Sequence, residues 1–192
     1  MRAVQEQLVD RGAWRGGPRT LLAAIGVQYL ELPLTAGLAW LLRPDGHHGL
    51  GSSMLVDLLD HLCPEAPRRV DASRVRVVRE ETRADERGKT RADLVIYGTG
   101  WTLVVEAKTF AVEQPEQLDR LYRLWTDDPD PQFVFLTRGE RDQKTAEVSA
   151  GRWTPLTWEQ VADIASSAAT SRAGVAPGVF DYLATLKGFH RV

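Results

Sequence analysis

The spacing of hydrophobic and polar residues switches along the chain between helix-like and strand-like periods, which predicts a mixed α/β fold. The clearest strand pattern lies at 91–108, where two short aliphatic runs flank a turn at Gly98-Thr99-Gly100. With Thr99 and Gly100 at the centre of the turn, Gly98 pairs with Trp101. Two antiparallel strands joined by a tight turn are therefore expected here.

Counting outward from this turn places Asp93 opposite Glu106. Because side chains alternate between the two faces of a strand, Asp93, Glu106 and Lys108 are expected on one face. The other face is apolar throughout and carries Leu94, Ile96, Leu103, Val105 and Ala107. Two carboxylates and an ammonium are thereby gathered on one side of an otherwise hydrophobic hairpin.

Helix-like spacing occurs before and after the hairpin. Helices are expected at 19–31, at 33–42 with Pro33 in the first turn, and at 53–62, 113–125, 157–169 and 179–186. Strands are expected at 74–77, 132–137 and 153–156, with a charged loop at 83–89 leading into the hairpin. The core order is helix, three antiparallel strands, helix, strand, which describes an α/β fold with a mixed sheet flanked by helices.

The length of 192 residues fits one domain. Residues 1–18 combine a short apolar pattern with Gly- and Pro-rich breaks, which is typical of a loosely ordered N-terminal arm. We therefore expect an arm at 1–18 and a single domain at 19–192.

Composition narrows the classes of function. The chain has 24 Lys and Arg against 26 Asp and Glu, so any contact with nucleic acid must use a local basic patch. A single cysteine, Cys63, excludes an internal disulfide framework and a Cys-rich zinc site. No apolar run reaches the roughly 20 residues that span a membrane, and no signal-peptide layout is present. A cytoplasmic protein without membrane contact is expected.

The charged face of the hairpin needs a physical reason, because burying unpaired charge is costly. Hard divalent cations such as Mg²⁺ or Mn²⁺ supply one, since they take carboxylate oxygens and water. Lys108 could then stabilise negative charge that develops near the ion. The alternative is a surface salt bridge between Lys108 and the two acids.

Asp93 followed, after a hairpin, by Glu106-Ala107-Lys108 resembles the signature of the PD-(D/E)XK nuclease superfamily. Ala92 stands where the proline that names the motif is usual. The resemblance extends over about 31–158 and implies a restriction-endonuclease-like αβββαβ core. It also implies metal-assisted hydrolysis of phosphodiester bonds, most commonly in DNA. Asp93 and Glu106, with the backbone carbonyl of Ala107, would hold the metal, and Lys108 would orient the attacking water.

The resemblance extends to two further residues. An acidic residue on the first core helix often adds a metal ligand in the superfamily, and Glu31 is the candidate; the alternative is a helix-capping or partly exposed glutamate. The RecB-like branch carries a Gln-x-x-x-Tyr pattern on the helix after the catalytic strand. Gln117 matches its glutamine, whereas Leu121 stands at the tyrosine position and Tyr122 follows it. Gln117 is therefore a candidate supporting residue, or else exposed helix surface.

Three cations, Arg87, Lys89 and Arg91, lie next to the site in the sequence. They could contact phosphates, which dominate nucleic-acid affinity, or they form a solvated hairpin tip. A metal-dependent deoxyribonuclease is the leading hypothesis. The alternatives are a non-catalytic module that retains the fold and binds nucleic acid or protein, and a structural subunit. Because no recognition domain is evident, a homodimer or a partner protein would supply any long sequence specificity.

Overall fold

The computed structural model describes residues 2–13, 16–65 and 68–188. Its helices are α1 (Arg2–Asp10), α2 (Leu21–Ala24), α3 (Glu31–Leu42), α4 (Ser53–Leu62), α5 (Gln117–Trp125), α6 (Trp158–Thr170) and α7 (Pro177–Lys187), with a short 3-10 turn at Ala72–Arg74. Its strands are β1 (Arg76–Asp85), β2 (Gly88–Gly98), β3 (Trp101–Lys108), β4 (Pro131–Thr137) and β5 (Trp153–Thr157).

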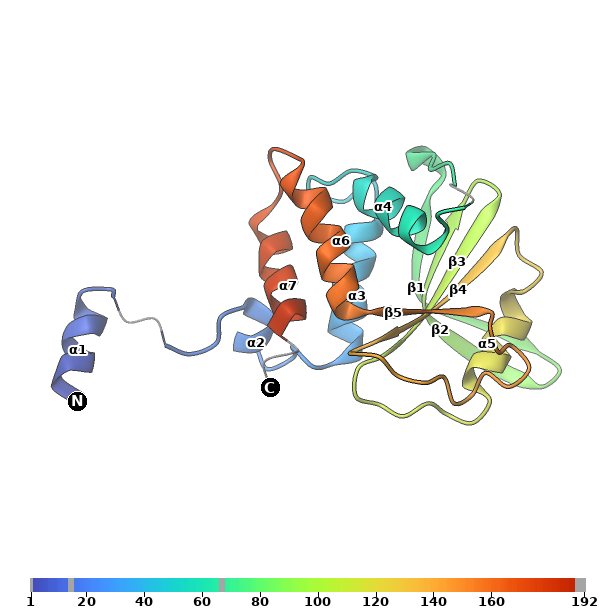
Figure 1. The fold of residues 1–192 in the computed structure, drawn as a ribbon, viewed down its shortest axis with the longest axis horizontal. Helices are drawn as coiled ribbons and strands as arrows, with labels where there is room; N and C mark the ends of the chain where they lie inside the picture. Colours follow the sequence, from blue (N-terminus) through green and yellow to red (C-terminus); the bar gives the residue numbers. More distant parts are fainter. Residues whose placement is uncertain (1, 14–15, 66–67, 189–192) are drawn as a thin grey trace.

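The strands form one sheet in the order β1-β2-β3-β4-β5 (Figure 1). Strands β1, β2 and β3 are an antiparallel meander, and β4 and β5 run parallel to β3. Helix α5 connects β3 to β4, which is the crossover that a parallel pair requires. The αβββαβ order predicted from the sequence is therefore present, extended by β5.

The two faces of the sheet are covered by different helices (Figure 1). Helices α3, α4, α6 and α7 pack on one face in a large hydrophobic core, which includes the five apolar hairpin residues Leu94, Ile96, Leu103, Val105 and Ala107. Helix α5 packs on the other face, where Leu118, Leu121 and Trp125 contact a smaller cluster of strand residues. The predicted apolar face of the hairpin is thus confirmed, and the opposite face is left to α5 and to polar side chains.

The register of the hairpin is also confirmed. Gly98 pairs with Trp101 and Leu94 with Val105, around a turn of Thr99 and Gly100. Glycine is needed at position 98 because a Cβ there would lie 2.0 Å from the Trp101 ring. The turn therefore fixes which residues of β2 and β3 meet at the other end of the hairpin.

The N-terminal helices differ from the prediction. The helix expected at 19–31 is only the four residues of α2, and Gly26, with a φ of 75°, follows it in the left-handed region. Helix α3 then begins at Glu31 rather than at Pro33. Proline is tolerated there because the first N–H groups of a helix have no partner within the helix.

Two other boundaries were wrong. The charged loop expected at 83–89 is mostly strand, since β1 continues to Asp85 and β2 begins at Gly88. Strand β1 is an edge strand, where charged side chains can remain partnered or solvated. Helix α5 begins at Gln117 rather than at 113, because Glu113 instead accepts hydrogen bonds from the N–H and hydroxyl of Thr145, at 2.9 and 2.7 Å.

Candidate active site

Asp93 lies where the sheet opens. Regular pairing of β2 with β3 stops at Leu94 and Val105, one residue before Asp93 would face Glu106. The backbone N–H of Ala107 donates instead to Oδ2 of Asp93, at 2.8 Å. A side-chain carboxylate thus replaces a backbone acceptor between the two strands and is held beside β3.

Strand β1 is distorted at the same level. The pairs Arg79 with Leu94 and Glu81 with Ala92 place Glu80 opposite Asp93. Glu80 has a φ of 53°, a left-handed conformation that is uncommon for a residue other than glycine. Such local strain is often found next to functional sites, and here it adjoins the residue that the sequence analysis selected.

Glu106 forms the floor of the site and is fully buried. Its Oε1 accepts two hydrogen bonds, one at 2.8 Å from Nζ of Lys108 and one at 2.6 Å from Nε2 of Gln117. Its Oε2 is buried without a hydrogen-bond partner among the described residues. A buried carboxylate oxygen without a donor is costly, so this atom marks a place for a bound cation or proton.

Lys108 and Glu31 complete one wall. Nζ of Lys108 lies 4.0 Å from Oε2 of Glu31, in addition to its contact with Glu106. Oε1 of Glu31 accepts a 2.8 Å hydrogen bond from the N–H of Thr109. Glu31 therefore belongs to the site rather than to a remote part of the surface. One of its oxygens is already engaged, because it orients the start of the segment that follows β3.

Gln117 connects the site to α5. Its amide group donates to Glu106, and its Oε1 accepts from the N–H of Gln114 at 3.0 Å. The exposed-surface alternative is excluded for Gln117, which is buried. The amide is thus oriented from both ends before any ligand binds.

The electrostatics of the site disfavour the charged forms of its two acids in the absence of a cation. Burial raises the pKa of Glu106 to about 8, and the neighbouring Asp93 adds to the effect. Burial also raises the pKa of Asp93 above its ordinary value. Burial alone would lower the pKa of Lys108, but the nearby carboxylates, Glu106 foremost, raise it overall. Two acids with raised pKa values beside a single ammonium indicate that the site has too little positive charge to keep both acids ionised.

The site is suited to a cation that needs few protein ligands. Within the described ranges, no three His, Cys, Asp or Glu side chains form a group able to hold a metal ion. Mg²⁺ is usually bound by one or two carboxylates and keeps waters or substrate phosphates as its other ligands. Asp93 and the unpartnered Oε2 of Glu106 fit that requirement, whereas a closed cage of the zinc type does not form.

A cleft of about 460 Å³ opens over these groups. Glu31, Asp93, Lys108 and Gln117 line it together with three further cations, Lys89, Arg91 and Arg120. Arg91 is held 2.8 Å from Oε1 of Glu80. Arg87 is exposed at the β1–β2 turn and is not among the residues that line the cleft.

Arg120 was missed by the sequence analysis. It follows Gln117 by three residues, and this spacing on a helix directs both side chains to the same face. Its Nη1 donates to the carbonyl of Pro115 at 2.7 Å, while its Nε is buried without a partner among the residues described. The signal was available, because any cation one turn after Gln117 faces the same cleft.

The paired histidines do not form a metal site. His48 is fully buried, and its Nδ1 accepts from the N–H of Leu50 at 3.0 Å. Its Nε2 therefore donates to the carbonyl of Arg43, 2.8 Å away. His47 is exposed. His48 therefore holds the loop before α4 through two hydrogen bonds.

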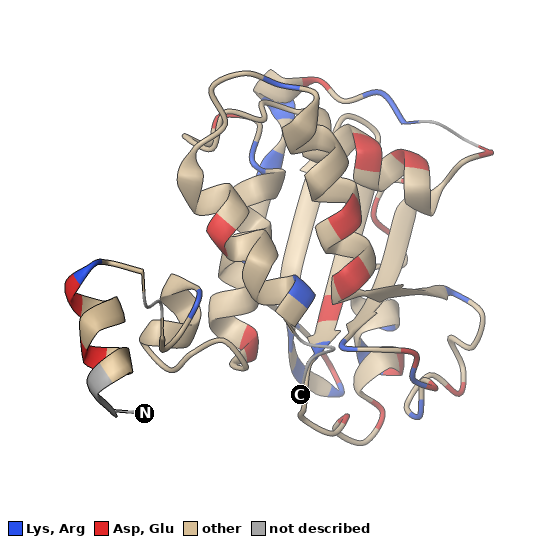
Figure 2. Ribbon diagram, turned by 60° about the vertical axis from the view of Figure 1, so that its left-hand side comes forward, with Lys and Arg blue, Asp and Glu red and all other residues tan. Residues whose placement is uncertain are grey.

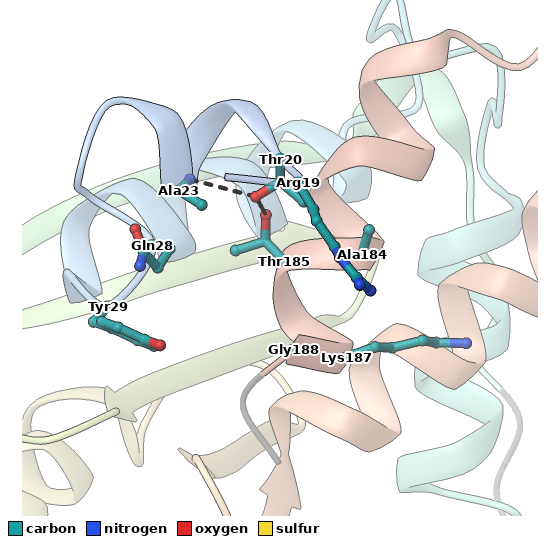
Figure 3. A pocket seen from close by; sticks show the side chains of 9 residues that line it. All are labelled: Arg19, Thr20, Ala23, Gln28, Tyr29, Ala184, Thr185, Lys187 and Gly188. Carbon is teal, nitrogen blue, oxygen red and sulfur yellow. Dashed lines mark hydrogen bonds between the residues drawn. The ribbon is translucent and has the colours of Figure 1, made fainter. Parts of the chain in front are cut away.

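A second cavity, of about 520 Å³, lies between α2 and α7 (Figure 3). Arg19 and Lys187 line it, and the hydroxyl of Thr185 donates to that of Thr20 at 2.8 Å across one wall. No acidic side chain is present among the described residues that line this cavity, so it offers no carboxylate ligands for a metal.

Charge elsewhere is mixed. Figure 2 shows acidic and basic segments interspersed over the ribbon rather than a single basic face, in agreement with the net charge of −2. None of the helices in the described part of the chain is long and apolar enough to cross a membrane.

Of three comparisons with known proteins, one identifies a family. A comparison with curated proteins finds no match. Among solved structures, the crystal structure of a protein of unknown function, AF1548, matches at 12% identity with a TM-score of 0.36, covering 70% of this chain and 78% of that one; a likeness this loose carries no argument. The family model of the PD-(D/E)XK nuclease superfamily matches residues 21–179. The mixed sheet and this match together show that the chain belongs to the PD-(D/E)XK nuclease superfamily and has its restriction-endonuclease-like fold.

Proposed function

We propose that the chain is a metal-dependent nuclease that hydrolyses phosphodiester bonds of DNA, with Asp93 and Glu106 holding Mg²⁺ or Mn²⁺. The observation that carries the proposal is the buried Oε2 of Glu106, which has no hydrogen-bond partner among the described residues and belongs to an acid whose pKa is raised. At this oxygen a divalent cation would supply the missing partner and would favour the charged form of Glu106. Family membership supports the nuclease class, and DNA is the commoner target in the superfamily.

Each neighbouring residue then has a definite task. A bound divalent cation stabilises the negative charge that develops on the phosphate. Lys108, 2.8 Å from Glu106, holds its ammonium beside the carboxylates, where it can orient the attacking water and offset the charge of the attacking oxygen. Gln117 fixes Oε1 of Glu106, which leaves Oε2 for the cation. The carbonyl of Ala107 is proposed as a further ligand.

Glu31 acts at the edge of this arrangement. Its Oε1 is engaged by the N–H of Thr109, and its Oε2 lies 4.0 Å from Lys108. We assign it a positioning role for Lys108 and Thr109, with Oε2 available as an additional ligand. Replacing Glu31 by glutamine should therefore reduce cleavage less than the same replacement of Glu106.

The substrate backbone is proposed to lie along Lys89, Arg91 and Arg120, which line the cleft from β2 and α5. Phosphate contacts from such cations give affinity without reading sequence. Because no separate recognition domain is evident in the described part of the chain, sequence specificity is proposed to come from a second copy of the chain or from a partner protein. Arg87 lies outside the cleft lining and has no assigned role in this arrangement.

The test is cleavage of linear duplex, circular duplex and single-stranded DNA, and of RNA, with Mg²⁺, Mn²⁺ or EDTA. Glu106→Gln removes the charge but keeps the shape, and Glu159→Gln, an exposed position on α6, is the matched control. Metal-dependent cutting by the parent protein and by Glu159→Gln, lost in Glu106→Gln, is the expected result.

Three other outcomes would be decisive. Cleavage of RNA alone, with the same dependence on Glu106, would correct the substrate and keep the chemistry. Undiminished cleavage by Glu106→Gln would overturn the proposed site. Absence of cleavage together with tight, metal-independent binding of nucleic acid would favour the non-catalytic module considered above.

A further inference from the structure

Two aromatic side chains meet beside the proposed site. Tyr29 precedes α3 by two residues, and Phe110 follows the last residue of β3 by two. Their ring centroids are 5.4 Å apart and the planes are nearly perpendicular, at 87°. The 2.8 Å hydrogen bond between Thr109 and Glu31 joins the same two segments, so the contact that positions Glu31 also brings these rings together.

Much of this aromatic pair faces solvent. Phe110 is 53% exposed and Tyr29 is 37% exposed. Leu32 and Val112, which line the cleft itself, are 48% and 80% exposed. A group of exposed apolar side chains bordered by charges marks a binding surface rather than ordinary protein exterior. Figure 3 shows Tyr29 from the side of the other cavity, at the edge of that hollow.

This apolar surface adjoins several cations. Lys89, Arg91 and Arg120 line the cleft next to Leu32 and Val112. The guanidinium carbon of Arg138 lies over the Phe110 ring, 4.9 Å from its centroid, and occupies one face, so a base would stack on the other face. Aromatic faces next to a cationic groove are the combination that binds single-stranded nucleic acid, because bases stack on the rings while phosphates meet the cations.

Phe110 and Lys108 are close enough along the chain to contact the base and the phosphate of one nucleotide. Phe110 is two residues from Lys108, which allows a separation of at most about 7 Å between their Cα atoms. A ring so placed would meet a base adjacent to the phosphate that is cut. A base within a duplex hides both faces in the stack and presents only its edges in the grooves. An unpaired base can offer a face.

We propose that Phe110, supported by Tyr29, is a stacking platform for an unpaired base next to the scissile phosphate, so that the substrate is single-stranded DNA or a duplex opened at the cleavage point. The inference rests on the proposed nuclease function, because it identifies the substrate of that same cleft. The occupant is a nucleobase because the patch is continuous with the cationic cleft over the acids.

The experiment measures binding of a fluorescent oligonucleotide by full-length protein carrying Asp93→Asn, which prevents cleavage during the measurement. Three ligands of equal length are compared: a base-bearing single strand, a strand of abasic sites that keeps only the phosphates, and a blunt duplex. Phe110→Ala is the test variant and Phe110→Trp restores an aromatic face. Phe180→Ala is the matched control, because Phe180 on α7 is 52% exposed and belongs to neither of the two segments that Thr109 and Glu31 join beside the site.

The platform predicts that Phe110→Ala weakens binding of the base-bearing strand by about 5- to 100-fold, the range for loss of one stacked base. Binding of the abasic strand and of the duplex should be unchanged, and Phe110→Trp and Phe180→Ala should bind like the parent. A loss confined to the strand with unpaired bases indicates loss of stacking, whereas a general unfolding of the loop would also weaken binding of the other two ligands.

Equal affinity of Phe110→Ala and its parent for the base-bearing strand would overturn the platform, and so would an equal loss for the abasic strand. Equal affinity of the two proteins for the base-bearing strand is also the result expected if the patch binds a protein partner instead. The proposed nuclease function is judged separately by cleavage with otherwise wild-type protein. Cleavage that depends on Glu106, with no effect of Phe110→Ala, would overturn the platform alone; neither cleavage nor binding would overturn both.

Discussion

Nε2 of Gln117 on α5 donates a 2.6 Å hydrogen bond to Oε1 of Glu106 on β3. Because Lys108 contacts the same oxygen, both donors lie at one end of the carboxylate and the other end is left without a partner among the described residues. The helix that covers the second face of the sheet therefore also determines which oxygen of Glu106 is available to a ligand.

Replacing Gln117 by alanine should lower metal affinity and cleavage by about 10- to 100-fold, the effect typical of groups that orient metal ligands. The physical reason is that Glu106 can then turn either oxygen toward Lys108. Calorimetric titration with Mn²⁺ and a cleavage assay measure the two quantities. Gln132→Ala is the matched control, since Gln132 bonds Asp130 and Cys63, away from the site. Parent-like metal affinity in Gln117→Ala would contradict the assigned role.

The stability of the metal-free protein should fall as pH rises from about 5 to 8. The pKa of Glu106 is raised to about 8 from an ordinary value of 4.5, so in this interval the folded state keeps a proton that the unfolded state has lost. The free energy of unfolding then decreases by up to about 1.4 kcal/mol per pH unit. The raised pKa of Lys108 acts only in more alkaline solution.

Glu106→Gln isolates this contribution because glutamine does not titrate. The free energy of unfolding is measured in EDTA by denaturant titration for the parent and for Glu106→Gln. As pH rises, that of the parent should decrease relative to that of Glu106→Gln. Saturating Mg²⁺ should weaken the dependence, since a cation favours the charged carboxylate. An identical pH dependence in the two proteins would show that Glu106 is not protonated in the fold.

Lys108→Met should separate metal binding from chemistry. Cleavage is expected to fall at least about 100-fold, the lower range for loss of a group that manages protons in the reaction. Metal affinity should be retained, because the carboxylates remain and lose a competing cation. Lys187→Met, which removes an exposed lysine paired with Asp163 at 3.3 Å, is the control. A loss of metal together with activity in Lys108→Met would mean that Lys108 serves mainly to hold Glu106.

Arg83 should be important for stability rather than for chemistry. Its guanidinium pairs with Asp128 at 2.7 and 2.9 Å, donates to the carbonyl of Leu124 and lies over the Trp125 ring. These contacts fasten the end of α5 to β1. Arg83→Ala should lower the free energy of unfolding by about 2–4 kcal/mol, because Asp128 is left partly buried without its partner.

Denaturant unfolding measures that change. Arg79→Ala, on the exposed side of the same strand, should change the free energy of unfolding by less than about 0.5 kcal/mol. Similar effects of the two substitutions would indicate that the Arg83 network is not what fixes α5.

Lys89 and Arg120 should account for part of the salt dependence of DNA binding. In protein with Asp93→Asn, Lys89→Ala or Arg120→Ala should each reduce the slope of log affinity against log salt concentration by about 1. Arg87→Ala is the internal control, since Arg87 lies at the hairpin tip and does not line the cleft. An effect of Arg87→Ala equal to that of Lys89→Ala would place the DNA along the hairpin tip instead.

The sequence predicted the part of the fold that depends on local pattern. The turn at Thr99 and Gly100 set the register of β2 and β3, and alternation along those strands correctly separated the apolar face from Glu106 and Lys108. Helix α6 likewise begins next to its expected start at 157, because Thr157 and Gln160 form a capping box there. These features are decided by neighbours within a few residues.

The errors arose where distant residues decide the structure. Glu113 could not be excluded from α5 by local preference, because its partner Thr145 is 32 residues away. The continuation of β1 to Asp85 is stabilised by the ion pair between Arg83 and the distant Asp128. The opening of the sheet at Asp93 and the unpartnered Oε2 of Glu106 are likewise tertiary features, so the sequence could name the residues of the site but not the oxygen left for a ligand.

The most direct test of the central claim is a crystal soaked in Mn²⁺, examined by anomalous diffraction. The account predicts one strong peak between the carboxylates of Asp93 and Glu106, in contact with Oε2 of Glu106, and no such peak in crystals of Glu106→Gln. Protein that cleaves DNA in Mn²⁺ but binds the ion elsewhere, or binds it equally well in Glu106→Gln, would contradict the assignment of this site.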